Sequence, residues 1–495
     1  MAASRKEKQA PAQQLAADPD SFFDAVIDQG IRPADDSARK RGTTLVQTFV
    51  DKLMAGMTAR KGTTKTLNEE IANIDRMLTE QLNEIMHHPE FQRLEAAWRG
   101  LKQFVSSTET GEEQKIKVLD CSKRELLRDF QAASEFTESA LWQKVYQGGY
   151  GQAGGDPFSM LVGDFEFDKG SMDVELLRQI SGVAAGAHAP FIAAANSKMF
   201  GMDSFTEMPN PRDLKKIFDK SNPENTEWIS FRNSEDSRYV ALCVPHVLAR
   251  QPYGPDNQVD EFDFREEVDG ETHDRYLWAN AGYSFASRVT DAFAKYHWTV
   301  AIRGFEGGGL VENLPIHKFK TREGDVGAKC PTEVLIPDDR EKELSDLGFV
   351  PLINYQNTNH AVFFGASSTQ LPKKYDDPDA TANAFLSAQL PYLFSTSRIA
   401  HYLKVICRDK VGSFASRDDI ETFLNRWISN YVLLSDNATQ EQKAKLPLRE
   451  ARVDVVEDRA RPGFYSAIAY LRPHFQLEGL NVSLRLVATL PTKKA

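Results

Sequence analysis

The chain has 495 residues, 41% of them apolar and 10% aromatic, so it can bury a sizeable core in about two to four domains. Its formal net charge of −11 argues against nucleic acid as a partner, because phosphate binding needs clustered lysine and arginine. No run reaches the roughly 20 apolar residues that a membrane span needs, the start is not a secretory signal, and the cysteines form no CxxC pair. We therefore expect a cytoplasmic protein that does not insert into a membrane.

Residues 1–60 combine a polar start with short apolar segments. Residues 1–20 are rich in alanine, proline and glutamine and are predicted to be disordered. In segment 43–57 apolar side chains recur at helical spacing, among them Leu45, Val46, Phe49 and Val50. A short apolar segment on a flexible tether is not stable alone and must find a surface. That surface belongs either to its own domain or to a neighbouring chain, and the sequence leaves both open.

Residues 61–110 are predicted to form two amphipathic helices. The first has Thr66 and Glu69 as a capping box, and the second starts at Pro89. One apolar stripe contains Leu67, Ile71, Ile74, Leu78, Leu82 and Ile85, and the other contains Phe91, Leu94, Trp98, Leu101 and Val105. The adjacent His87 and His88 fall between the helices, where neighbouring side chains do not face one another. The pattern favours a helical hairpin over a metal or reaction centre.

Residues 111–379 alternate between strand and helix patterns. Strands are predicted at 115–121, 158–167, 190–196, 227–231, 239–248, 298–304, 332–337, 349–353 and 360–366. Helices are predicted at 123–131, where Ser122 and Glu125 form a capping box, and at 173–189, 213–219 and 276–297. This alternation predicts an α/β (α+β) fold with mixed sheets covered by helices.

Residues 380–495 become helical again and end in a predicted pair of strands. Val482, Leu484 and Leu486 alternate with polar residues in the last strand, as in a half-buried sheet. The helix pattern at 416–431 has a broad apolar stripe for the chain's own core. Asp418, Glu421 and Arg426 fall largely outside that stripe, where they either form a solvated face or contact another protein.

Two glycine-rich segments invite comparison with nucleotide-binding loops. Residues 149–154 match G-x-G-x-x-G, but a helix precedes them and a strand follows, the reverse of a dinucleotide-binding fold. Residues 304–309 follow a predicted strand, yet they lack the lysine and the helix of a P-loop. Both are interpreted as structural loops. An α/β enzyme that uses the loop at 304–309 and a scaffold protein that forms a closed oligomer remain the alternative functions.

Several long runs resemble the large subunit of the bacterial type VI secretion contractile sheath. They include "HHPEFQRLEAAWRGL", "FIAAANSKMFGM", "WANAGYSFASRVTDAFAKYHW", "IRGFEGGGLVENLP" and "RPGFYSAIAYLRPHFQLEGLNVSLRLVATLP". They occur in the expected order from about residue 67 to residue 491, so the resemblance covers nearly the whole chain.

The resemblance implies a structural protein without cofactor, metal or catalytic residues. In that family the large subunit forms an obligate heterodimer with a small sheath subunit, and the heterodimers stack as six-fold rings into a helical sheath around an inner tube protein. The sheath is attached to a baseplate, its contraction propels the tube and effectors into target cells, and an unfoldase ATPase recycles it mainly through the small subunit.

The resemblance also implies a role for each part of the chain. Residues 1–60 would be a flexible linker for contacts between protomers, and residues 61–110 would pack against the small subunit through Leu78, Leu82, Phe91, Leu94 and Trp98. Residues 111–379 would form the middle and outer domain. Residues 380–495 would form a phage tail-sheath-like inner domain, with Val482, Leu484 and Leu486 in strand pairing and Asp418, Glu421 and Arg426 toward the tube.

Overall fold

The computed structural model describes residues 35–57, 63–210, 213–260, 262–321, 324–410, 417–435, 437–457, 465–474 and 476. The predicted terminal strand with Val482, Leu484 and Leu486 lies outside the described residues. The chain divides into two compact units, which are described separately: one contains residues up to Ile85 together with Tyr253–Glu266, and the other contains Met86–Pro252 and the chain from Glu267 onward.

The first unit contains two long helices, α2 (Asp36–Met57) and α3 (Thr63–Met86). Before α2, the Asp35 carboxylate accepts hydrogen bonds from the Ala38 amide (2.6 Å) and the Ser37 hydroxyl (2.8 Å). Helix α3 begins three residues before the predicted cap at Thr66. The side chain of Asn83 on α3 is buried and donates to the carbonyl of Arg265 (3.2 Å), which joins α3 to the second segment of this unit.

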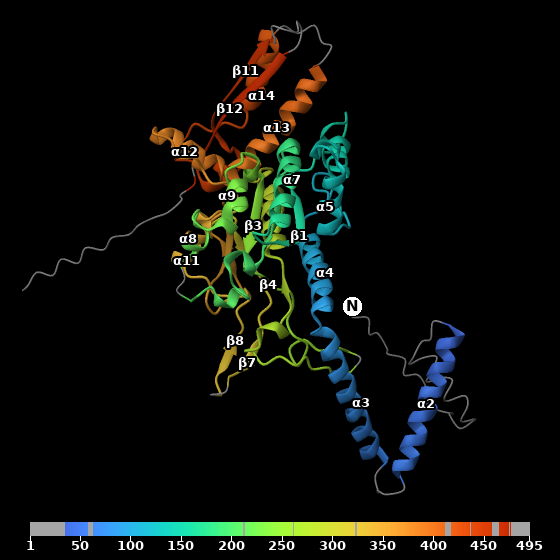
Figure 1. Ribbon diagram of the computed structural model, residues 1–495. Helices are drawn as coiled ribbons and strands as arrows, with labels where there is room; N and C mark the ends of the chain where they lie inside the picture. Colours follow the sequence, from blue (N-terminus) through green and yellow to red (C-terminus); the bar gives the residue numbers. More distant parts are fainter. Residues whose placement is uncertain are drawn as a thin grey trace, which may run out of the picture. The chain divides into compact units, whose positions relative to one another are not determined.

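The centre of the second unit is a six-stranded mixed sheet in the order β1-β2-β3-β9-β10-β6 (Figure 1). Its strands are β1 (Leu161–Phe167), β2 (Phe191–Ala195), β3 (Val240–Val244), β9 (Val350–Asn354), β10 (Ala361–Phe363) and β6 (Leu310–Val311). The first four strands are parallel, and β10 is antiparallel to both β9 and β6. Every residue of β2, β3 and β9 is buried, which explains their continuous apolar runs.

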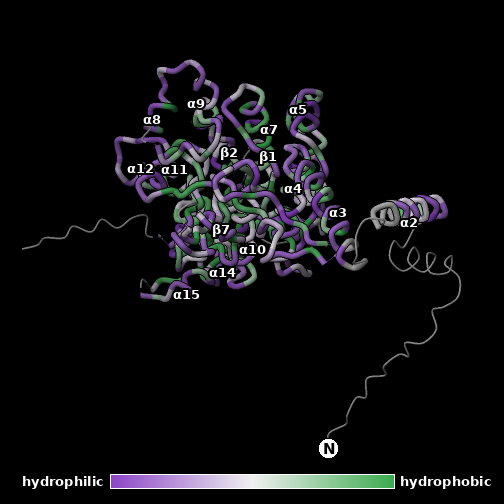
Figure 2. Tube along the Cα trace, turned by 90° about the horizontal axis from the view of Figure 1, so that it is seen from below, coloured by the Kyte–Doolittle hydropathy of each residue, from purple (hydrophilic) through white to green (hydrophobic). Residues whose placement is uncertain are grey.

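Helices pack around this sheet and close its core. They are α4 (Pro89–Ser107), α5 (Lys123–Ala132), α6 (Ala140–Trp142), α7 (Ser171–Ala187), α8 (Leu214–Ile217), α9 (Thr226–Arg232), α10 (Ala281–Tyr296) and α11 (Asp338–Asp346). A π-helix covers Gln143–Tyr150. Figure 2 shows apolar stretches of this unit around α7, β1 and β2, and polar stretches around α8 and α12. Small two-stranded sheets are formed by β4 (Val247–Leu248) with β5 (Trp278–Ala279) and by β7 (Lys318–Lys320) with β8 (Val326–Ala328).

The C-terminal elements gather at one end of this unit (Figure 1). They are α12 (Pro378–Ser387), α13 (Leu390–Lys410), α14 (Arg417–Ser429), α15 (Gln440–Lys445), β11 (Leu448–Glu457) and β12 (Tyr465–Pro473). A second core lies here, made by Trp298, Val300, Ile399, Leu424, Ile428, Leu448, Val453 and Val455. Helix α13 contributes Leu390, Leu393 and Phe394 to the first core and Ile399 to the second, so one helix joins the two cores.

The structure confirms the mixed α/β fold and corrects several predicted elements. Residues 227–231 are helical within α9, because Trp228, Phe231 and Arg232 are buried at helical spacing on one side. Residues 115–121, 298–304 and 332–337 form no named strand in the described chain. Strand β11 was not predicted, and it is the partner of β12 over nine paired positions from Leu448–Pro473 to Glu457–Tyr465. Helix α4 begins at Pro89 and α5 has the Ser122–Glu125 capping box, both as predicted.

Candidate assembly surfaces

Helix α4 presents an apolar seam to solvent. Its N-cap is His88, whose Nδ1 accepts a hydrogen bond from the Glu90 amide (3.4 Å). Phe91, Leu94, Trp98 and Val105 are 37%, 56%, 65% and 41% exposed. These are large apolar side chains on one face of a helix that has its own core-facing side, with Gly100 and Phe104 buried. Such a contiguous exposed stripe marks a protein-binding surface.

Helix α3, in the first unit, has a comparable stripe. Ile71, Ile74, Met77, Leu78 and Ile85 are all at least 39% exposed, and Leu82 is half-buried. All of these except Met77 belong to the predicted stripe, and Leu67, the first member of that stripe, lies outside the residues whose burial is described. Because α3 and α4 belong to different units, their arrangement as a hairpin stays a prediction.

Helix α2 contains the apolar segment that was predicted as an inter-protomer contact. Leu45 is 68% exposed and Val46 is half-buried. Phe49 and Val50 lie in the same helix, and the description does not extend to their side chains.

The hairpin of β11 and β12 forms the second candidate surface. The two strands make a sheet of their own among the described residues, so the outer edge of β12 has no ladder partner there. Val456, Tyr465, Ile468 and Tyr470 are 42–52% exposed. An open strand edge with exposed apolar side chains can accept another strand through main-chain hydrogen bonds.

Helix α14 carries the three residues that were predicted to face a tube. Asp418 is exposed and pairs with Arg417 (3.0 Å), and Arg426 is exposed. Glu421 differs from them: it is half-buried, and its carboxylate accepts a hydrogen bond from the Val455 amide of β11 (3.0 Å). Leu424 and Ile428 of the predicted apolar stripe are buried, whereas Phe423 of that stripe is 43% exposed under the Lys410 ammonium.

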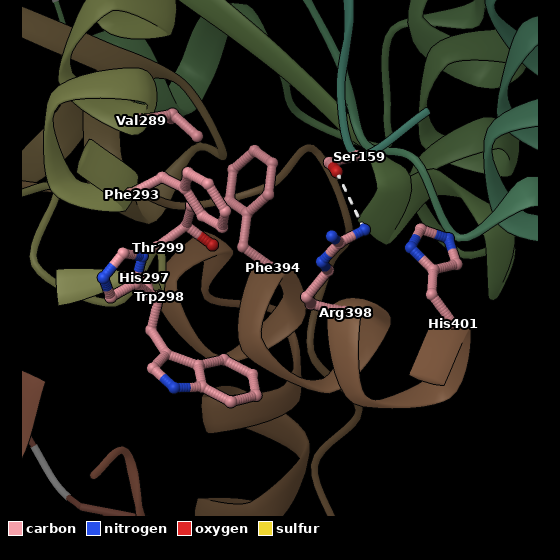
Figure 3. A pocket seen from close by; sticks show the side chains of 9 residues that line it. All are labelled: Ser159, Val289, Phe293, His297, Trp298, Thr299, Phe394, Arg398 and His401. Atoms are coloured by element: carbon pink, nitrogen blue, oxygen red, sulfur yellow. Dashed lines mark hydrogen bonds between the residues drawn. The ribbon is translucent and has the colours of Figure 1, made fainter. Parts of the chain in front are cut away.

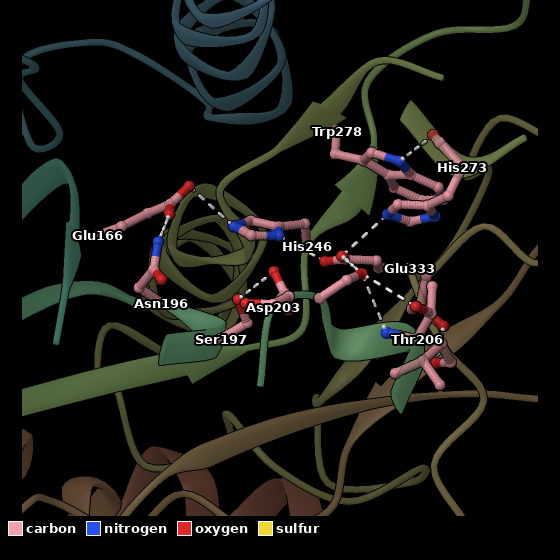
Figure 4. A network of polar contacts seen from close by, with 12 residues as sticks. Glu166, Asn196, Ser197, Asp203, Thr206, His246, His273, Trp278 and Glu333 are labelled. Atoms are coloured by element: carbon pink, nitrogen blue, oxygen red, sulfur yellow. Dashed lines mark hydrogen bonds and ion pairs between the residues drawn. The ribbon is translucent and has the colours of Figure 1, made fainter. Parts of the chain in front are cut away.

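A network of charged side chains, which the sequence did not reveal, lies beside the sheet of the second unit (Figure 4). His246 donates from Nε2 to Glu166 (2.9 Å) and from Nδ1 to Glu333 (2.5 Å), and His273 Nε2 donates to Glu333 (2.9 Å). Burial alone would lower the pKa of His246, but the two carboxylates raise it to about 10. These residues are between 27 and 167 positions apart, so no short sequence motif predicts the network.

The remaining pockets and polar groups point to no defined chemistry. A cavity of about 30 Å³, lined by residues such as Phe394, Arg398 and His401, has room for one or two water molecules (Figure 3). Arg398 Nη1 donates to Ser159 Oγ there (3.5 Å). Within the described ranges, no group of three or more His, Cys, Asp or Glu side chains could hold a metal ion. No helix in the described part of the chain has the length and apolar content to cross a bilayer.

The glycine loop at 304–309 is built into the sheet. The Gly304 amide donates to the carbonyl of Phe363 (2.7 Å), the Phe363 amide donates to Gly309 (3.0 Å), and the Gly309 amide donates to Gly304 (2.9 Å). Gly304 and Gly308 have φ values of 77° and 92°. The backbone donors at both ends of the loop are therefore engaged within the chain.

Comparison with known proteins finds matches over nearly the whole chain. Residues 68–370 match the family described as EvpB/VC_A0108, tail sheath N-terminal domain, and residues 379–490 match EvpB/VC_A0108, tail sheath gpW/gp25-like domain. The chain is 47% identical over 487 residues to the type VI secretion system sheath protein TssC1 of Pseudomonas aeruginosa, covering 97% of each chain.

Two solved structures of the anti-feeding prophage have a distant likeness to this chain. The anti-feeding prophage baseplate gives a TM-score of 0.36 at 11% identity, over 64% of this chain and 66% of that one. The anti-feeding prophage helical sheath in the contracted state gives 0.31 at 13% identity, over 76% and 99%. With TM-scores below 0.5, these likenesses add nothing to the assignment. The family matches and the high identity to TssC1 confirm the predicted resemblance: the chain belongs to the type VI secretion tail-sheath family, as a large sheath subunit.

Proposed function

We propose that the chain forms an obligate heterodimer with the small sheath subunit and that the heterodimers polymerise, as six-fold rings, into a helical sheath around an inner tube. Contraction of this sheath propels the tube and its effectors into a target cell. The observation that carries the proposal is the 47% identity to a type VI sheath protein over 97% of both chains. The protein acts in the bacterial cytoplasm, attached to a baseplate, and an unfoldase ATPase recycles it mainly through the small subunit.

The exposed apolar seams support an obligate partner. Large apolar side chains line α3 and α4 on their solvent sides, including Leu78, Leu82, Phe91, Leu94 and Trp98. A surface of this kind favours aggregation unless another subunit covers it. Obligate interfaces bury on the order of 2,000 Å² or more and are more apolar than transient ones.

The chain ends support linkage between protomers. The edge of β12 can pair with an extended strand, and residues 477–491, with Val482, Leu484 and Leu486, have the alternation of such a strand. The segment with Leu45, Val46, Phe49 and Val50 provides a second contact. Head-to-tail contacts that do not close generate a helical polymer, and flexible links keep neighbours connected while the folded bodies move. Contraction then requires no ATP in this chain, because a trapped extended lattice can relax to one with more buried interface.

Co-expression with the small subunit tests the proposal. Expressed alone, the chain should be poorly soluble or self-associated, whereas the co-expressed pair should purify as a heterodimer and form tubules in electron micrographs. A stable, well-behaved monomer without the partner would argue against the proposal. Uniform closed particles would favour a scaffold protein, and monomers that melt at higher temperature with a small ligand would favour an enzyme.

A further inference from the structure

Gln476, which follows the last described strand, is held by three hydrogen bonds. Its side-chain oxygen accepts from Arg303 Nε (2.6 Å), and its side-chain nitrogen donates to the carbonyl of Val300 (3.0 Å). Only this orientation of the side-chain amide suits both neighbours, because a guanidinium group can only donate and a carbonyl can only accept. The backbone amide of Gln476 also donates to the Tyr392 hydroxyl (2.9 Å). All three partners are at most 7% exposed, so residue 476 is tied to buried parts of the chain.

The partners of Gln476 belong to segments that connect the two cores. Tyr392 lies on α13, the helix that contributes side chains to both cores. Val300 is part of the second core, and Ile302, two residues further on, is part of the first. The hydrogen bonds therefore attach residue 476 to two segments that each contribute to both cores, and none of the three goes to β11 or β12.

The register of the hairpin shows how a pull on the end of the chain would act on it. Pro473 at the end of β12 pairs with Leu448 at the start of β11, so the chain leaves the hairpin beside the point where it enters. A pull at such an end loads the hydrogen bonds between antiparallel strands one after another, since they run across the strands. Bonds that break in turn resist far less force than bonds that break together. The contacts of Gln476 lie between the hairpin and residues 477–491, the segment that the proposed function assigns to pairing between protomers.

We propose that Gln476 is a positioning residue that anchors the base of the C-terminal segment to the two cores. Force from a neighbouring protomer then enters the folded body through Arg303, Val300 and Tyr392, and it does not peel β12 away from β11. The inference rests on the proposed function and deepens it, because it names the point where a link between protomers is attached. A residue that only finished strand β12 would bond to β11 or β12, and the hydrogen bonds of Gln476 do neither.

Hydrogen exchange of the co-expressed heterodimer tests the anchor without load. Gln476→Leu removes both side-chain hydrogen bonds with little change in size. The amides of β12 that bond to β11 within residues 469–472 should then exchange roughly tenfold faster or more, because this end of the hairpin is no longer held. Amides near Tyr465, at the other end of β12, and recovery of the small subunit should stay unchanged. Gln440→Leu is the matched control, because Gln440 is exposed at the start of α15 in the same part of the chain.

Tyr392→Phe tests the same anchor from the other side. It removes the hydroxyl that accepts from the backbone amide of Gln476 and leaves the ring in place, so the same amides of β12 should exchange faster by a smaller factor. An increase of equal size throughout the chain in both variants would mean that these residues serve stability alone, and it would overturn the anchor.

Contraction of sheaths assembled on tubes tests the anchor under load. Extended sheaths of Gln476→Leu should reach the wild-type length, but contraction should leave shorter fragments in electron micrographs, because β12 peels away where a link is loaded. If sheaths of Gln476→Leu and Gln440→Leu contract to the same length, the anchor is overturned and the proposed function still stands. If the wild-type heterodimer forms no tubules at all, the proposed function itself fails.

Discussion

Glu333 joins three segments of the chain through two histidines. His246 follows strand β3, His273 lies in a short 3₁₀ turn, and Glu166 belongs to β1. Because the imidazole of His246 donates to a carboxylate on each side, its protonated form is the stable one. Burial alone would raise the pKa of Glu333, but hydrogen bonds from both histidines lower it to about 2. The network therefore links these segments beside the sheet through ion pairs.

We predict that His246→Gln lowers the free energy of unfolding by about 3 kcal/mol near pH 6, because removing one member of a buried ion pair leaves the others uncompensated. The pKa of His246 is raised from 6.5 to about 10, so its contribution is complete below pH 6.5 and is lost as pH rises through about 10. The pKa of Glu333 is lowered from 4.5 to about 2, so its contribution is complete above pH 4.5 and is lost as pH falls through about 2.

The measurement is chemical unfolding of heterodimers that contain the wild type or the variant, between pH 5 and pH 10. The difference in the free energy of unfolding between wild type and variant should be largest from pH 5 to 6.5 and should become smaller toward pH 10. His297→Gln is the control, because that histidine forms an exposed and therefore weak ion pair with Glu113 at 3.6 Å. A difference that is constant with pH would mean that His246 acts by packing and not by charge.

At the scale of elements, two glycines in the loop at 304–309 differ in how strongly the backbone requires glycine. Gly308 has a φ of 92°, and a Cβ there would overlap the carbonyl oxygen of Ala301. Gly304 has a φ of 77° but open space around it. We predict that Gly308→Asn destabilises the chain by more than about 2 kcal/mol, whereas Gly304→Asn costs about 1 kcal/mol, since asparagine tolerates positive φ only where there is room. Thermal unfolding of the two variants in the heterodimer compares them, and equal losses would contradict the geometric account.

Predicted and observed elements differ at short apolar runs, because such a run alone does not distinguish a strand from a helix. Strands β2, β3 and β9 were predictable, because buried parallel strands are continuous apolar runs. The run at 227–231 has the same appearance, yet it folds as α9, since a few apolar residues fit either period. Strand β11 was not predicted, although Val453 and Val455 alternate there with charged residues, as in a half-buried strand. The exposed seams of α3 and α4 were predictable from spacing, whereas Arg250 at the seam's inner side was not, because only the fold brings it to Glu95.

At the scale of the whole molecule, the N-terminal region should matter for the polymer and not for the folded body. We predict that removal of residues 1–60 leaves the heterodimer intact, because, among the described residues, the core clusters of the second unit contain none from this region. Long tubules should no longer form, since a link between protomers is lost. Size-exclusion chromatography measures the heterodimer and electron microscopy measures tubule length. Contractile tubules from the truncated protein would show that the segment only docks on its own chain.

The proposed contact with the tube depends on exposed ion pairs, and α14 offers few exposed charges for it. Of the three residues predicted there, Glu421 is engaged by β11, which leaves Asp418 and Arg426 exposed. A grip that must release on contraction is favoured by exposed ion pairs, each worth about 0–1 kcal/mol and weakened by salt. We predict that Asp418→Lys reduces assembly of extended sheath on tubes more at low than at high salt, while tube-free, contracted-like sheaths still form. Glu441→Lys on α15 is the matched reversal of an exposed charge in the same part of the chain. If sedimentation with tubes is equal for wild type and both variants, or if Asp418→Lys loses the heterodimer, α14 does not contact the tube.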